Sequence, residues 1–168
     1  HVDIGSRVDG FVAHVASFRQ IDVFDIRTLE VNHPNITFIQ CDLMSNVQEE
    51  LVSCCDSLSC LHALEHFGLG RYGDPINYDG HLVGLSNLTK LLERGGTLYL
   101  SVPIGEPRIE FNAHRVFAVS DLIKLLKNNY EIEKFSYVDD SGELYRHIDL
   151  LERASDIQRN FDCHYGCG

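Results

Sequence analysis

The first ten residues constrain the fold of this chain more than any other stretch. A short segment, 1–4, that resembles the end of a buried strand stops at Gly5, and an apolar run, 11–18, begins after Gly10. This order predicts a buried strand, a tight glycine turn and a helix. A glycine turn lets the backbone approach a ligand closely, and the first N–H groups of a helix have no partner within the helix. Together these parts are typical of a nucleotide-binding site.

The rest of the chain continues the alternation of strand and helix. Segments rich in β-branched and aromatic residues predict further strands at 20–26, 35–42, 56–63, 97–103 and 130–138. Leucine spacing predicts helices at 81–93 and 121–127, capped by Asp79 and Ser120, with Leu82 on the buried face of the first. A shorter helix is expected at 48–54. This alternation predicts an α/β fold with a doubly wound, mostly parallel sheet.

Three consecutive predicted strands end in Gly5, Asp25 and Asp42. The carboxyl ends of parallel strands lie along one edge of a sheet, where α/β proteins bind their ligands. Asp25 follows the glycine turn by about twenty residues, where dinucleotide-binding folds place a ribose-binding carboxylate. The alternative for Asp25 is a carboxylate that only begins a loop. Two acids at consecutive strand ends behind a glycine turn favour the ligand site.

The composition suits a single globular domain, 1–168, and excludes few functions. A net charge of −11 argues against a nucleic-acid-binding surface, and no apolar run is long enough to span a membrane. The six cysteines form no repeated C-x-x-C pattern, which argues against structural zinc. The chain opens on His and closes on Gly-Cys-Gly, so we expect a missing N-terminus and assign a cytoplasmic location only by default.

Over nearly its whole length the sequence resembles the class I S-adenosylmethionine-dependent methyltransferase superfamily. The resemblance rests on segment 2–6 around Gly5, on Asp25 and Asp42, on the fourth-strand segment 56–66, and on the helix–glycine–strand segment 91–98. Segments 68–75 and 112–115 are similar to a branch filed as a domain of unknown function. The resemblance implies a Rossmann-like sheet flanked by helices and clipped at both ends, with 165–168 beginning a final antiparallel strand.

The same resemblance implies S-adenosyl-L-methionine as the cofactor. The residues it assigns to cofactor binding are Asp3, Gly5, Ser6, Asp25, Ile26, Asp42, Leu43, Leu61 and His62. The sequence departs from the family where further glycines are usual, because Ser6-Arg7-Val8-Asp9 stands there instead. Arg7 either pairs with the cofactor carboxylate or crowds the pocket of a domain that has lost binding.

Methyl transfer to a hydroxyl needs a base, which we expect just past the fourth or fifth strand. The catalytic candidates are Glu65, His66 and His114. His62-Ala63-Leu64-Glu65-His66 also matches the inverted zinc-peptidase motif, but that motif needs a continuous helix and this segment follows a strand. A metal-dependent O-methyltransferase stays open, with His62, Glu65, His66 and His114 as candidate ligands of a divalent cation. Otherwise Glu65 and His66 close the pocket through hydrogen bonds.

The residues expected on the substrate side are Arg71, Tyr72, Asp74, Asn112 and Arg115. The two arginines suit a carboxylate or phosphate on the acceptor; alternatively Arg71 pairs with Asp74, and Arg115 caps a helix. Two functions remain in view. One is a methyltransferase acting on a small-molecule or sugar-like hydroxyl, and the other is a non-catalytic binding or scaffolding module on the same fold. A nicotinamide enzyme is disfavoured because no G-x-G-x-x-G is present.

Overall fold

The computed structural model describes residues 1–110 and 112–168, which form two compact units, His1–Leu100 and Ser101–Gly168. We call these the first and the second unit and describe each by itself. The expectation of one domain over 1–168 stays a prediction.

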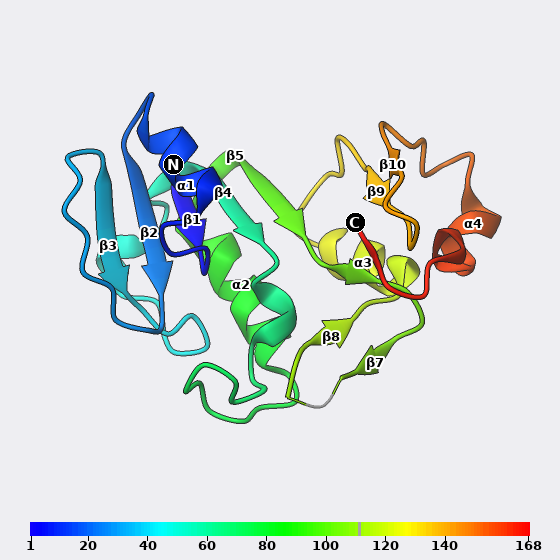
Figure 1. The fold of residues 1–168 in the computed structure, drawn as a ribbon, viewed down its shortest axis with the longest axis horizontal. Coiled ribbons are helices and arrows are strands. Elements are labelled where there is room, and N and C mark those ends of the chain that lie inside the picture. The colour runs from blue at the N-terminus through cyan, green and yellow to red at the C-terminus, as the bar shows by residue number, and fades with distance from the viewer. Residues whose placement is uncertain (111) are drawn as a thin grey trace. The chain divides into compact units, whose positions relative to one another are not determined.

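The first unit is built on a five-stranded sheet with the order β3-β2-β1-β4-β5. Strand β1 pairs in parallel with both β2 and β4, and β2 pairs in parallel with β3. Figure 1 shows these strands side by side in blue, cyan and green. The strands are β1 (Val2–Ile4), β2 (Ile21–Asp25), β3 (Ile36–Gln40), β4 (Cys55–Leu61) and β5 (Leu92–Ser101). The predicted doubly wound, parallel Rossmann-like sheet is confirmed.

Helix α1 (Gly10–Ala16) covers one face of this sheet. Val12 and Ala16 pack against Ile21 and Val23 of β2, and all four are almost completely buried. Ile21 and Val23 share a face because side chains alternate along a strand. This contact places the glycine turn, which joins β1 to α1, at the carboxyl edge of the sheet.

Helix α2 (Gly80–Leu91) corresponds to the helix predicted at 81–93, with two differences. Leu85, Leu88 and Leu91 are buried as expected, whereas Leu82 is 40% exposed because it lies outside that stripe. Asp79 occupies the N-cap position but its side chain makes no capping hydrogen bond. The helix predicted at 48–54 is reduced to the 3-10 turn η1 (Glu49–Leu51), and a second 3-10 turn, η2 (Leu64–His66), follows β4.

The second unit contains a four-stranded sheet of order β10-β9-β11-β6 and a two-stranded sheet of β7 and β8. Its elements are β6 (Pro103–Ile104), β7 (Arg108–Ile109), β8 (Arg115–Val116), α3 (Val119–Leu126), β9 (Tyr137–Val138), β10 (Leu144–Tyr145), α4 (Ala154–Gln158), the 3-10 turn η3 (Asn160–Asp162) and β11 (Gly166–Cys167). Strand β11 is antiparallel to β6 and β9, as the resemblance implied.

Two predictions for the second unit are wrong. The strand expected at 130–138 is present only at its end, as β9. Helix α3 begins at Val119, so Ser120 lies inside it, and the N–H of Val119 is bound at 2.9 Å by the side-chain oxygen of Asn160. A residue distant in sequence therefore replaces the expected local cap.

No helix in the described part of the chain is long and apolar enough to cross a membrane. All six cysteines lie in the described part of the chain, and none of them forms a disulfide.

Candidate functional site

A pocket of about 90 Å³ lies in the first unit, at the carboxyl ends of its strands. It is lined by Ile4, Gly5, Phe24, Asp25, Ile26, Arg27, Cys41, Asp42, Leu43, Met44, His62, Ala63, His66, Phe67, Tyr72 and Asp74. These residues come from the exits of β1, β2, β3 and β4 and from the segment before α2. The three strand ends singled out in the sequence therefore meet in one place.

The glycine turn, Gly5–Asp9, forms the end of the pocket beside β1. Gly5 has a φ of +79°, and a Cβ there would lie 2.8 Å from the Cβ of Ala63. Only glycine meets both conditions without strain. Arg7 also has a positive φ, +58°, so the backbone bends here without further glycines. The Asp9 side chain accepts a hydrogen bond from Val12 N at 2.9 Å and caps α1.

Asp3 is completely buried beneath the glycine turn rather than on the pocket wall. Its Oδ1 accepts a hydrogen bond from Ser59 Oγ at 2.5 Å, and Oδ2 has no hydrogen-bond partner among the described residues. The ring nitrogens of His1 lie 2.6 Å from Ser57 Oγ and 3.0 Å from Ser59 Oγ. Burial raises the pKa of Asp3, against the lowering effect of the Ser59 hydrogen bond. Asp3 therefore ties β1 to β4 and does not line the pocket, and its predicted role in cofactor binding stays a prediction.

The β2 exit, Asp25–Arg27, forms the middle of the pocket. The Asp25 carboxylate accepts hydrogen bonds from Arg27 N at 2.8 Å, Arg27 Nε at 2.9 Å and Arg27 Nη2 at 2.7 Å. The Arg27 guanidinium also lies 4.3 Å from the centre of the Tyr72 ring. Arg27 was not predicted as a site residue.

Asp42 shapes the turn that follows β3. Its Oδ1 accepts a hydrogen bond from Met44 N at 2.9 Å, and its Oδ2 accepts one from Ser45 Oγ at 3.1 Å. Asn87 of α2 holds the same turn from behind, because its amide nitrogen donates to the carbonyls of Leu43 and Ser45, both at 2.8 Å. The turn that carries Asp42 and Leu43 is thus fixed before any ligand arrives.

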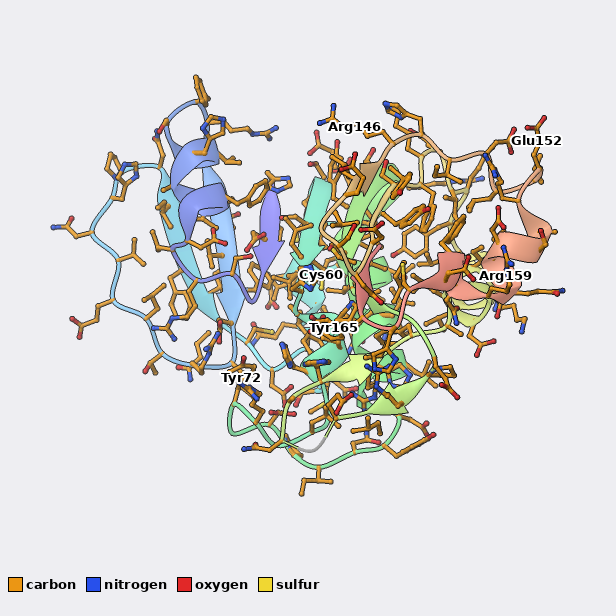
Figure 2. All side chains as sticks on the ribbon, turned by 45° about the vertical axis from the view of Figure 1, so that its right-hand side comes forward. Cys60, Tyr72, Arg146, Glu152, Arg159 and Tyr165 are labelled. Carbon is orange, nitrogen blue, oxygen red and sulfur yellow. The ribbon has the colours of Figure 1, made fainter. Side chains whose placement is uncertain are left out.

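The segment 67–79, which we call the Tyr72 loop, is organised by Asp74. This carboxylate accepts hydrogen bonds from the N–H groups of Gly68, Gly70 and Tyr72 at 2.8, 3.1 and 3.1 Å. The Nε of Arg71 donates to the Tyr72 hydroxyl at 3.3 Å. Tyr72 lies just beyond the carboxyl end of β2 (Figure 2).

His62, Glu65 and His66 meet where β4 ends. Glu65 is buried, and its Oε1 lies 3.2 Å from His62 Nδ1 and 3.9 Å from His66 Nε2. His62 has a φ of +54°, which turns the chain sharply after β4. The His66 ring contacts the Tyr72 ring edge-on, with centroids 5.3 Å apart. Both histidines line the pocket, while Glu65 lies behind them.

The metal expectation is not supported by these contacts. No group of three His, Cys, Asp or Glu side chains within 1–110 and 112–168 is arranged to hold an ion. The contacts of the two histidine rings with the Glu65 carboxylate are between protein atoms, at 3.2 Å for His62 Nδ1 and 3.9 Å for His66 Nε2.

Three predicted residues lie in the second unit. Arg115 is buried in β8, where its backbone pairs with Ile109. The His114 ring contacts Tyr165, with centroids 5.1 Å apart, and Asn112 has a φ of +51°. Their roles toward a substrate stay predictions.

The pocket thus unites more than half of the predicted site. The predicted residues that line it are Gly5, Asp25, Ile26, Asp42, Leu43, His62, His66, Tyr72 and Asp74. Asp3, Ser6, Leu61, Glu65 and Arg71 adjoin lining residues in sequence without lining it themselves. The lining residues that were not predicted as site residues are Ile4, Phe24, Arg27, Cys41, Met44, Ala63 and Phe67. The only signal for Arg27 was its place two residues after Asp25.

Residues 14–163 match a family described as "Caenorhabditis protein of unknown function, DUF268". The chain belongs to this family. No curated protein matches its sequence.

Several solved structures share the fold of this DUF268 chain. One is a Burkholderia thailandensis 1,6-didemethyltoxoflavin-N1-methyltransferase, solved with bound 1,6-didemethyltoxoflavin and S-adenosylhomocysteine. It superimposes with a TM-score of 0.59 at 15% sequence identity, and the match covers 88% of this chain and 71% of that protein. The N-methyltransferase NodS from Bradyrhizobium japonicum, solved with S-adenosylhomocysteine, gives a TM-score of 0.56 at 15% identity. That match covers 88% of this chain and 77% of NodS. The [4+2]-cyclase SpnF gives a TM-score of 0.57 at 13% identity, over 82% of this chain and 53% of SpnF. The fold is therefore that of S-adenosylmethionine-dependent methyltransferases.

Proposed function

We propose that the pocket of the first unit binds S-adenosyl-L-methionine and that the chain is a methyltransferase acting on a hydroxyl of a small-molecule or sugar-like acceptor. One observation carries the proposal: Gly5, Asp25 and Asp42, from three consecutive strand ends, line a single pocket. Two structures with the same fold were solved with S-adenosylhomocysteine, which supports the choice of cofactor.

The residues fit such a cofactor. Gly5 packs so closely on Ala63 that a Cβ would overlap it, and the backbone of the turn itself lines the pocket. Asp25 is the acceptor for the ribose hydroxyls, and Asp42 with Leu43 lies where the adenine would bind. Phe24, Ile26, Met44 and Phe67 supply apolar surface around them.

When bound, the cofactor supplies an electrophilic methyl group on a sulfonium. The chain's own task is to orient the acceptor and to remove its proton. His66 lines the pocket and is the proposed base, and Glu65 is a positioning residue whose Oε1 faces both His62 and His66. Such a base contributes roughly 10²–10⁴-fold to the rate. His114 stays an alternative base.

The acceptor side is assigned to the Tyr72 loop. Tyr72 presents its ring to the pocket, and the exposed Arg71 guanidinium beside it suits a carboxylate or phosphate on the acceptor. The net charge of −11 is consistent with a small acceptor rather than a nucleic acid.

The second candidate function is a module on the same fold that does not transfer methyl groups. The ion pair of Arg27 with Asp25, which occupies the proposed ribose site, favours it. The fold alone does not decide, since a cyclase shares it.

Calorimetry with S-adenosylhomocysteine tests cofactor binding, and transfer of labelled methyl from S-adenosylmethionine to a panel of hydroxyl acceptors tests activity. We expect binding, and a rate that falls about 10²–10⁴-fold in His66→Ala with little change in cofactor affinity. His14→Ala, at an exposed position on α1, is the matched control. Binding without transfer to any acceptor favours the non-catalytic module, and no binding by either the wild type or Arg27→Ala contradicts the proposal.

A further inference from the structure

The most unusual contact in the pocket is the one between Asp25 and Arg27. The Asp25 side chain is 2% exposed, and both of its oxygens are held by Arg27. The backbone N–H of Arg27 adds a third hydrogen bond to Oδ1. These are charge-assisted hydrogen bonds in a fork geometry, the strongest kind that an arginine makes with a carboxylate.

Arg27 is also held by two other walls of the pocket. Its Nη2 donates to the Gly5 carbonyl at 3.4 Å, and its guanidinium stacks on Tyr72. Tyr72 is in turn positioned by Asp74, which binds its backbone N–H. One side chain thus connects the glycine turn, the β2 exit and the Tyr72 loop.

The closed arrangement leaves little room. The cavity measures about 90 Å³, whereas pockets for drug-sized ligands are roughly 300–1,000 Å³. Oδ1 of Asp25 already accepts two hydrogen bonds and Oδ2 accepts one, so about one of its four lone-pair sites is left. A ribose diol, which donates two hydrogen bonds, therefore competes with this position of Arg27 at Asp25.

We propose, on the basis of the function proposed above, that Arg27 competes with the cofactor ribose for Asp25; we call this competing contact the latch. The contact between Arg27 and Tyr72 then helps to set the affinity for the cofactor, and the two side chains must separate before the cofactor binds. Binding exchanges the guanidinium for two hydroxyl donors at Asp25. The Tyr72 loop, which carries the acceptor-side residues, opens with the release of Arg27. Cofactor binding is thereby coupled to access for the acceptor.

Calorimetry with S-adenosylhomocysteine tests the competition. Removing the latch raises the population of the binding-competent state, so Arg27→Ala is expected to tighten binding roughly ten-fold. Tyr72→Leu removes only the stacking contact and is expected to tighten binding about two- to five-fold. Arg19→Ala is the matched control, because Arg19 is exposed and precedes the amino end of β2, the end opposite the pocket. It leaves the affinity unchanged.

An Asp25 left without its arginine could weaken the fold, so Arg27→Gln, which keeps one amide donor, is a second variant expected to bind more tightly than the wild type. If the wild type binds and neither Arg27 variant binds more tightly, the latch is wrong although the proposed function stands. If the wild type does not bind but Arg27→Ala does, the latch is supported in its strongest form.

Amide hydrogen exchange tests the latch without any cofactor. In Arg27→Ala the amides of the Tyr72 loop, 67–79, are expected to exchange several-fold faster than in the wild type, because their contact with the β2 exit is lost. Amides of α1 serve as the internal control. Unchanged exchange in the Tyr72 loop overturns the latch whatever the outcome of the binding experiment. If no variant binds the cofactor at all, the proposed function fails, and the exchange result alone decides whether Arg27 holds the loop.

Discussion

The glycine turn and the β2 exit line the same pocket, but each departs from the expectation that its sequence raises. The glycine turn is more regular in structure than its sequence suggests, and the β2 exit is less accessible. The glycine turn lacks the usual further glycines, yet Arg7 adopts a positive φ and does not line the pocket. The β2 exit has the expected acid at the expected place, yet Arg27 binds both oxygens of that acid. The glycine turn, whose sequence is irregular, therefore keeps a sharply bent backbone. The β2 exit, whose sequence is regular, carries the side chain that blocks the proposed ribose site. The residue types at a turn therefore say less about whether the turn can form a binding site than the backbone conformation that the fold imposes.

The largest effect is expected at Gly5. Gly5→Ala combines a positive φ with an overlap against Ala63, and the two costs together should lower the free energy of unfolding by about 2–5 kcal/mol. Urea denaturation measures the loss. Gly10→Ala is the control, since a Cβ there meets nothing within 4 Å, and it should be neutral or slightly stabilising. Equal losses in the two variants would mean that Gly5 is not a special position.

A smaller effect is expected at Asp3, and it depends on pH. Because burial raises its pKa, the folded state keeps this proton to a higher pH than the unfolded chain, whose carboxyl titrates near 3.8. The stabilisation that the protonated Asp3 gives to the folded state is fully present below the unfolded pKa, and it is lost as pH rises through the folded pKa. The wild type should therefore lose stability relative to Asp3→Asn as pH rises above about 3.8. A difference that is constant with pH, measured by urea denaturation, would contradict the assignment.

Asp9 offers a local test of the glycine turn. Asp9→Ala removes the side-chain cap of α1 and should cost about 1 kcal/mol of unfolding free energy, whereas Asp9→Asn keeps an acceptor and should cost much less. Thermal unfolding of the two variants side by side makes the comparison. If both lose the same amount, the hydrogen bond to Val12 does not stabilise the helix start.

The smallest effect is expected at Arg7. Arg7→Gly relieves the positive φ but loosens the unfolded chain, so the net change should be a gain of no more than about 1 kcal/mol. Cofactor affinity should stay the same, because Arg7 does not line the pocket and its side chain reaches only the Thr28 carbonyl, at 3.4 Å. A marked loss of affinity would show that Arg7, rather than Arg27, acts on the ligand.

Much of this architecture could be predicted from local patterns. Gly5, Asp25 and Asp42 each end a short apolar run, and parallel strands bring such ends together, so the pocket followed from the strand order. The cap of α3 could not be predicted, because Asn160 lies far along the chain from Val119. The position of Arg27 could not be predicted either. Its contacts with Gly5 and Tyr72 depend on three loops folding together, and no periodicity in the sequence records that.

The central claim is that one carboxylate, Asp25, is shared in turn by Arg27 and by the cofactor. A crystal structure of the chain with S-adenosylhomocysteine tests it most directly. The account predicts the ribose hydroxyls on Asp25, the adenine beside Asp42, and the Arg27 guanidinium displaced from the carboxylate and from the Tyr72 ring. Cofactor bound elsewhere, or bound with the ion pair between Arg27 and Asp25 intact, would contradict it.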